Sequence, residues 1–175
     1  MQVGGRLVIG YGSDLRGDDA AGRLAAGAVA AWGLPGVRVL SVHQLTPDLA
    51  GPVAEAAMVV FLDAHAAAGC PRPRIRRLAP ALRGPHLGHH GGPRAILAWA
   101  ALAGGRAPAA YWATIPAQTF ALGAELSPRT RGAIRAMLPA IRRLLDRPVG
   151  VPGTRAQGDS RPEASHPPRP SILYP

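Results

Sequence analysis

Several short apolar segments of this sequence are each followed by side chains that could bind a metal ion. In chain order these are Asp14, Asp18 and Asp19; His43, Gln44 and Thr46; Asp63 and His65; and His86, His89 and His90. Carboxylate oxygens and imidazole nitrogens are common ligands of divalent metals, and a set of three leaves coordination positions for water or a substrate. If the fold brings two carboxylates and one imidazole together, the sequence predicts a divalent metal site.

Each of these residues also has a simpler explanation. An aspartate after a strand most often caps a helix or lies in an exposed turn, and a histidine pair such as His89 and His90 is commonly on the surface. Asp63 is the strongest candidate, because it directly follows the apolar run VVFL. A carboxylate at such a place is costly to bury without a charged or hydrogen-bonded partner.

Alternating strands and helices are expected to position these side chains. Apolar runs with β-branched residues predict strands at 6–11, 37–42, 57–62 and 109–116. Residues 64–88 are less regular, and an edge strand is expected there at 74–78. Helices are expected at 18–32, from Pro47 with Thr46 as N-cap, at 93–103 and at 127–146. This alternation predicts an α/β fold, with three α/β/α layers and an open, twisted, mostly parallel sheet of about five strands. Ligands bind beyond the carboxyl ends of such strands, so the candidate residues should converge at one edge.

The 175 residues are enough for one domain with a sizeable core. We expect this α/β domain at 1–146. Residues 147–175 are rich in Pro, Gly, Ser and Arg, without an apolar period before Ile172, and predict a disordered tail.

Composition argues against several classes of protein. The single cysteine, Cys70, excludes an intramolecular disulfide and a thiolate zinc cluster, which fits a reducing cytoplasm. No apolar run approaches the roughly 18 residues of a membrane helix, and the N-terminal residues lack the apolar core of a signal peptide. The net charge of +10 comes from 20 arginines without lysine. Their densest group, at 72–83, has no interleaved aromatic residues that could stack on bases, so nucleic-acid binding is not favoured.

Common catalytic and cofactor motifs are missing or incomplete. Gly10 and Gly12 follow a strand, but Leu15 stands where a dinucleotide fingerprint needs its third glycine. The sequence contains no P-loop and no G-x-S-x-G nucleophile elbow. A divalent metal site is therefore the main chemical hypothesis that the residues themselves support.

One set of motifs resembles the hydrogenase maturation proteases, the endopeptidases that trim the large subunit of nickel-iron hydrogenases. The segment 10–22, GYGSDLRGDDAAG, is similar to the family pattern GxGN-x-L-x-x-D-[DE]-G-x-G. The segment HQLTPDL at 43–49, a strand ending in Asp63, the pair His89 and His90 before a helix, and FALG at 120–123 followed by Leu126 and Ser127 also match. Ser13 and Ala20 depart from the pattern, where the family has Asn and Gly.

The resemblance implies a metal-dependent endopeptidase of the cytoplasm. Asp19, Asp63 and His89 would be the metal ligands and catalytic residues, and His43, Gln44, Thr46 and His90 would line the substrate cleft. The metal would be nickel, supplied by the substrate rather than permanently bound. The partner would be the nickel-loaded hydrogenase large-subunit precursor, which loses a short C-terminal peptide. No partner nucleic acid or membrane is expected.

Two other classes of function remain open from the sequence. A non-catalytic, nickel-binding maturation scaffold would use the same ligands without turnover. An Arg-rich nucleic-acid-binding protein would show binding that weakens steeply with salt.

Overall fold

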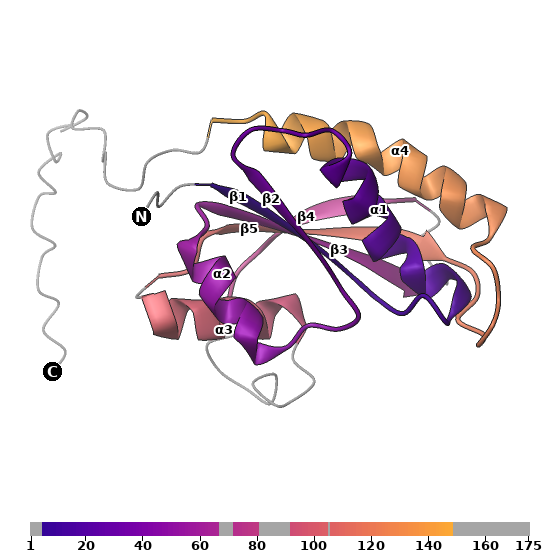
Figure 1. The fold of residues 1–175 in the computed structure, drawn as a ribbon, viewed down its shortest axis with the longest axis horizontal. Coiled ribbons are helices and arrows are strands. Elements are labelled where there is room, and N and C mark those ends of the chain that lie inside the picture. Colours follow the sequence, from indigo (N-terminus) through magenta and orange to yellow (C-terminus); the bar gives the residue numbers. More distant parts are fainter. Residues whose placement is uncertain (1–4, 67–71, 81–91, 105, 149–175) are drawn as a thin grey trace, which may run out of the picture.

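Five strands form one open sheet that carries helices on both faces (Figure 1). The computed structural model describes residues 5–66, 72–80, 92–104 and 106–148. The strands are β1 (Arg6–Tyr11), β2 (Val37–Val42), β3 (Met58–Ala66), β4 (Arg74–Leu78) and β5 (Ala109–Ala117). The helices are α1 (Ala21–Ala30), α2 (Ala50–Glu55), α3 (Pro93–Gly104) and α4 (Pro128–Leu145), with short 3-10 turns η1 (Gly17–Ala20) and η2 (Pro47–Leu49).

The strand order is β2-β1-β3-β5-β4, and only β4, at one edge, runs antiparallel to its neighbour. This confirms the predicted α/β class and mostly parallel sheet. The chain leaves β1 toward one edge and then returns to place β3 on the other side of β1. At such a reversal, the connections after the two strands diverge and open a crevice at their carboxyl ends.

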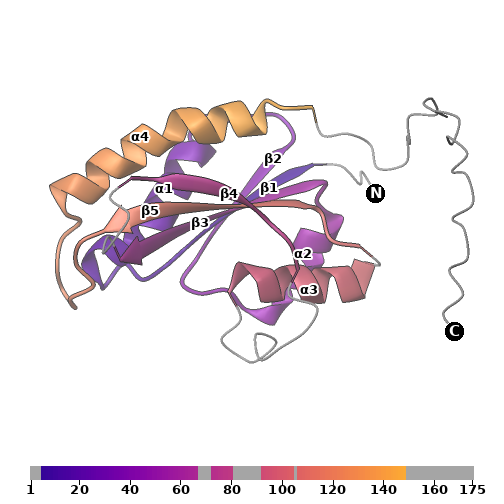
Figure 2. The same ribbon diagram turned by 180° about the vertical axis from the view of Figure 1, so that it is seen from behind.

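Two apolar cores cover the two faces of the sheet, because successive strand residues point to opposite sides. On one face α1 and α4 pack against Val8, Val60 and Leu62. On the other face α2 and α3 pack against Ile9 and Phe61. Figures 1 and 2 show the two helix pairs on opposite sides of the sheet. The observed layers are the three that the sequence predicts.

Glycines let α1 approach the sheet closely. A Cβ atom on Gly22 would lie 2.3 Å from the carbonyl oxygen of Leu62, and one on Gly10 would lie 2.3 Å from the carbonyl oxygen of Gly22. Side chains at these positions would force the backbones apart. The beginning of α1 is thereby held against the carboxyl ends of β1 and β3, where the preceding turn carries Asp19.

Three local expectations are corrected. The helix expected at 18–32 begins with the 3-10 turn η1, and its α-helical part ends at Ala30. Strand β3 does not end at Asp63 but continues to Ala66, because it keeps pairing with β5 after its pairing with β1 stops at Leu62. Thr46 occupies the N-cap position of η2, but its side chain makes no capping hydrogen bond.

The two departures from the family pattern are accommodated. Ala20 has a φ of −65°, so this position needs no glycine. The hydroxyl of Ser13 accepts a hydrogen bond from the backbone N–H of Leu15 at 3.3 Å, as expected for a turn residue.

Within the described ranges, no helix combines the length and apolar character needed to cross a membrane. Most of the predicted tail, residues 149–175, lies outside the described residues, so its predicted disorder stays a prediction.

Candidate functional site

A cavity of about 290 Å³ lies at the carboxyl ends of β1 and β3. Its described lining consists of Tyr11, Gly12, Asp19, His43, Gln44, Leu45, Asp63 and Gly92. Four residues singled out from the sequence therefore share one cavity, at the place where the strand order reverses. This is the usual position of a ligand site in an open α/β sheet.

Asp63 is partly buried and contacts Tyr11 in the lining of the cavity. The Tyr11 hydroxyl donates a hydrogen bond to Asp63 Oδ2 at 2.6 Å. The pKa of Asp63 is raised to about 6, mainly by burial and also by the nearby charge of Asp19, while the hydrogen bond from Tyr11 acts in the opposite direction. Burial and the Asp63 charge also raise the pKa of Tyr11, which keeps its hydroxyl protonated as a donor. A positive charge in the cavity would relieve this cost of ionising Asp63.

Trp112 extends the polar group from the neighbouring strand β5. Its indole helps to lower the pKa of both Tyr11 and Asp63. Its buried Nε1–H lies near this pair without the geometry of a hydrogen bond, and has no partner among the described residues. Asp63 is therefore held between two side chains that can donate protons in hydrogen bonds but carry no positive charge.

The turn after β1 positions Asp19. The backbone N–H of Ser13 donates to Asp19 Oδ2 at 2.7 Å. Gly12 has a φ of +131°, and a Cβ at this position would lie 1.9 Å from the carbonyl oxygen of Asp19. The close turn, which requires glycine, thus fixes the carboxylate of Asp19 at the rim of the cavity.

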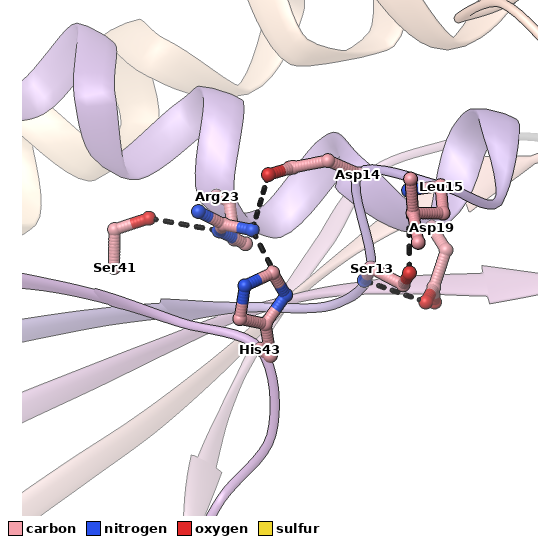
Figure 3. A network of polar contacts seen from close by, with 7 residues as sticks. All are labelled: Ser13, Asp14, Leu15, Asp19, Arg23, Ser41 and His43. Carbon is pink, nitrogen blue, oxygen red and sulfur yellow. Dashed lines mark hydrogen bonds and ion pairs between the residues drawn. The ribbon is translucent and has the colours of Figure 1, made fainter.

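Arg23 joins the turns that follow β1 and β2, as Figure 3 shows. Its guanidinium forms an ion pair with Asp14 and donates to Ser41 Oγ at 3.1 Å. One nitrogen lies 3.2 Å from His43 Nδ1, which accepts in this contact because a guanidinium can only donate. Asp14 is therefore occupied by a salt bridge, and His43 is held at the cavity wall by α1.

Asp18 has a structural role instead of facing the cavity. Three backbone N–H groups and two hydroxyls lie within hydrogen-bond distance of its fully buried carboxylate. They belong to Gln118, Thr119, Ser127 and Thr130. Although burial opposes ionisation, these bonds hold the pKa of Asp18 below its usual range. Its carboxylate joins the turn before α1 to the loop that leads into α4.

These positions leave the predicted ligand set untested. Thr46 lies just before η2 and is not among the described residues that line the cavity. His86, His89 and His90 lie outside the described residues. Among the residues that are described, no three His, Cys, Asp or Glu side chains are placed to hold a metal ion. The ligand set Asp19, Asp63 and His89 thus stays a prediction, with its two carboxylates in one cavity.

Sequence reasoning missed Tyr11, Trp112 and Arg23. Tyr11 could have been found, because the alternation of β1 places it on the same face as Leu7 and Ile9 and at the end where Asp63 was expected. Trp112 and Arg23 left no such signal, since each contacts residues of other secondary-structure elements that no local sequence pattern connects to it.

Comparisons with known proteins bear on the fold. Neither a protein-family model nor a curated protein matches the sequence. Three similar solved structures are a hydrogenase maturating endopeptidase, HybD, from E. coli; a [NiFe] hydrogenase maturation protease, HycI, from Thermococcus kodakarensis KOD1; and a hydrogenase 2 maturation peptidase from a thaumarchaeon. In that order, the TM-scores are 0.66, 0.65 and 0.61, and the sequence identities are 20%, 23% and 20%.

The alignments cover 81%, 82% and 81% of this chain and 91%, 93% and 98% of the respective structures. Nearly the whole of each solved structure is therefore matched by the domain described above. With identities this low, the likeness concerns the backbone architecture, and it agrees with the resemblance found in the sequence motifs. This chain has the fold of the hydrogenase maturation proteases.

Proposed function

We propose that this chain is an endopeptidase that removes a C-terminal peptide from the nickel-loaded precursor of a nickel-iron hydrogenase large subunit. The observation that carries the proposal is the pair of carboxylates, Asp19 and Asp63, in one cavity at the reversal of the strand order. The similar solved structures support this choice of substrate, because they are described as hydrogenase maturation endopeptidases. We place the activity in the cytoplasm, which the single cysteine favours.

The chemistry of the cavity suits a divalent cation brought by the substrate. Asp63 is partly buried, its pKa is raised, and no cationic side chain is among the described residues that line the cavity. We propose Asp19 and Asp63 as oxygen ligands and His89 as the third ligand. A metal ion held there can polarise a scissile carbonyl or lower the pKa of a bound water.

The protein's own groups would orient the reacting parts. Tyr11 donates to Asp63 Oδ2, and the Ser13 N–H donates to Asp19 Oδ2, so each carboxylate is held in place by one of its oxygens. At neutral pH most of the Asp63 carboxyl is ionised, since its pKa is about 6. In this state it can bind a cation or accept a proton from water at Oδ1.

Incubation with nickel-loaded and nickel-free hydrogenase precursor tests the proposal by the mass of the precursor. We expect shortening of the nickel-loaded form alone, and a loss of at least about a hundredfold in rate for Asp63→Asn, since the charge that binds the cation is gone. Asp48→Asn is the matched control, because Asp48 is exposed in η2 and outside the cavity lining.

Three results would contradict the proposal. Normal cleavage by a folded Asp63→Asn variant would show that the Asp63 carboxylate is not needed for the reaction. Equal cleavage of the nickel-free and nickel-loaded precursors would show that nickel is not the signal for cleavage. Binding of the nickel-loaded precursor without any mass loss would favour the non-catalytic scaffold.

A further inference from the structure

A second cavity, of about 500 Å³, lies on the same face of the sheet, toward the β4 edge. Its described lining consists of His65, Arg74, Ile75, Arg76, Trp112 and Thr114. None of these side chains is acidic, whereas the first cavity contains two carboxylates. The two cavities therefore place opposite charges side by side on one sheet face.

The strand register fixes how far apart these charges are. Asp63 pairs with Thr114, and Thr114 pairs with Arg74, so the three residues form one row across β3, β5 and β4. Directly paired residues share a face of the sheet. With strands about 4.8 Å apart, the Cα atoms of Asp63 and Arg74 are about 10 Å apart. An extended polypeptide spans this distance with about three residues.

The arginines of the second cavity are available to a ligand. The two ion pairs between described residues are Arg23 with Asp14 and Arg142 with Asp146, so neither Arg74 nor Arg76 has an acidic partner there. Arg76 lies with its guanidinium carbon 4.3 Å from the ring centre of Trp112, and this stacking holds its side chain over β5. A guanidinium stacked in this way keeps its N–H groups free for a carboxylate.

Two further polar groups support a ligand at this place. His65 Nδ1 is buried and has no hydrogen-bond partner among the described residues, although His65 lines the cavity. The hydroxyl of Thr114 belongs to the same row as Arg74. A buried polar atom without a partner costs free energy, which a bound group can recover.

We propose that Arg74 and Arg76, together with His65 and Thr114, form a subsite for an acidic side chain of the polypeptide substrate. The inference rests on the proposed function, because it takes the substrate to be a polypeptide that passes Asp63. The acidic side chain would lie about three residues from the bond held at Asp63. A nucleic acid fits less well, because Arg76 covers the ring of Trp112 and the neighbouring carboxylates of Asp19 and Asp63 repel a polyanion.

Binding of two model peptides tests the subsite without any need for cleavage. The peptides are acetyl-Ala-Ala-Glu-Ala-Ala-amide and the same peptide with Gln in place of Glu. The indole N–H resonance of Trp112, assigned by its absence in Trp112→Phe, reports binding by NMR. We expect a saturable shift with the Glu peptide, and binding of the Gln peptide weaker by about tenfold, since a charge-assisted hydrogen bond is lost.

The adjacent residue Arg77 provides a matched control. Arg77 pairs with Tyr111 and lines a cavity with residues of α4, so it points to the opposite face of the sheet. Arg74→Gln and Arg76→Gln should each weaken binding of the Glu peptide by about fivefold or more, and Arg77→Gln should change it by less than about twofold. Equal binding of both peptides, or equal effects of all three substitutions, would overturn the subsite.

Steady-state cleavage separates a failure of the subsite from a failure of the proposed function. On nickel-loaded precursor we expect Arg74→Gln to raise KM with little change in kcat, because it removes substrate binding remote from the reacting bond. An unchanged KM, with normal cleavage by the unaltered protein, would overturn the subsite alone. Absence of cleavage by the unaltered protein would overturn the proposed function, and the peptide measurements would then decide the subsite by themselves.

Discussion

Asp18 and Asp63 lie at the same end of the sheet, yet their surroundings have opposite effects on the charge. Five donors lie within hydrogen-bond distance of the Asp18 carboxylate, and its pKa is lowered. Asp63 relies on the hydroxyl of Tyr11, with weaker help from Trp112 and the N–H of Ala64, and its pKa is raised to about 6. Burial alone therefore does not decide whether a carboxylate stabilises a fold.

The difference separates a structural carboxylate from one available for chemistry. The hydrogen-bonding capacity of Asp18 is used by groups of its own chain, so nothing is left for a ligand. Asp63 is under-supplied with donors and faces a cavity, which is the arrangement expected of a group that must bind or exchange a cation or proton. Substitution by asparagine should therefore have opposite consequences at the two positions.

The largest effect on folding is expected for Asp18→Asn. The amide keeps one acceptor oxygen but directs an NH₂ group at several donors, so buried N–H groups of the 118–127 loop lose their partner. We expect the free energy of unfolding at pH 7 to fall by about 3 to 5 kcal/mol, measured by urea denaturation. Since the pKa of Asp18 is lowered in the folded state, this stabilisation is present at neutral pH and is lost as the pH falls through the acidic range.

The exposed Asp48 serves as the control for this change. Asp48→Asn should alter the free energy of unfolding by less than about 0.5 kcal/mol, as is usual for a surface substitution. If Asp18→Asn were as mild as Asp48→Asn, the hydrogen bonds around Asp18 would not hold the loop, and the contrast between the two carboxylates would disappear.

Asp63→Asn should stabilise the protein above pH 7 while it abolishes cleavage. The pKa of Asp63 is raised from 3.8 to about 6 in the folded state. The folded state therefore binds more protons between these values, and stability falls as the pH rises through this window. A shift of about two units corresponds to about 3 kcal/mol at most. Asparagine avoids this loss of stability, because its side chain cannot ionise and can still accept the hydrogen bond from the Tyr11 hydroxyl.

The measurement is the free energy of unfolding of both proteins at pH 4 and pH 8. At each pH we compare the free energy of unfolding of Asp63→Asn with that of the unaltered protein. We expect this difference to be more favourable to the variant at pH 8 than at pH 4, by up to about 3 kcal/mol. A difference that does not change with pH would contradict the raised pKa, and a loss of stability at pH 8 would make Asp63 a structural carboxylate like Asp18.

Local sequence patterns account for most of the fold but for less of the site. Apolar runs predicted the inner strands β1, β3 and β5, since burial on both faces requires nearly continuous apolar residues. The edge strands β2 and β4 were also expected at their observed places, although β4 holds three arginines. The predicted end of β3 was wrong. Ala64 and His65 have no strand pattern of their own, and they belong to the strand because they pair with residues of β5. The role of Asp18 could not be predicted, because its partners lie about a hundred residues away in the chain.

Substitution of Tyr11 tests the contrast between Asp18 and Asp63 further, and it is expected to change the free energy of unfolding least. Tyr11→Phe keeps the ring but removes the hydroxyl that donates to Asp63 Oδ2 at 2.6 Å. Because this bond favours the charged form, its loss should raise the pKa of Asp63 above about 6, by roughly one unit. Tyr111→Phe is the control, since Tyr111 packs against the core on the α4 side of the sheet.

Linkage then fixes the sign of the stability change for Tyr11→Phe. At pH 8 Asp63 is charged and loses a donor that stabilises its charge, whereas at pH 4 it is protonated and loses little. The destabilisation should therefore be larger at pH 8 than at pH 4 by about 1.4 kcal/mol for a shift of one unit. The Tyr111→Phe effect should be the same at both pH values. Equal losses for Tyr11→Phe at both pH values would show that the hydroxyl contributes only packing or neutral hydrogen bonding, and Asp63 would then owe its ionisation at neutral pH to other groups around the cavity.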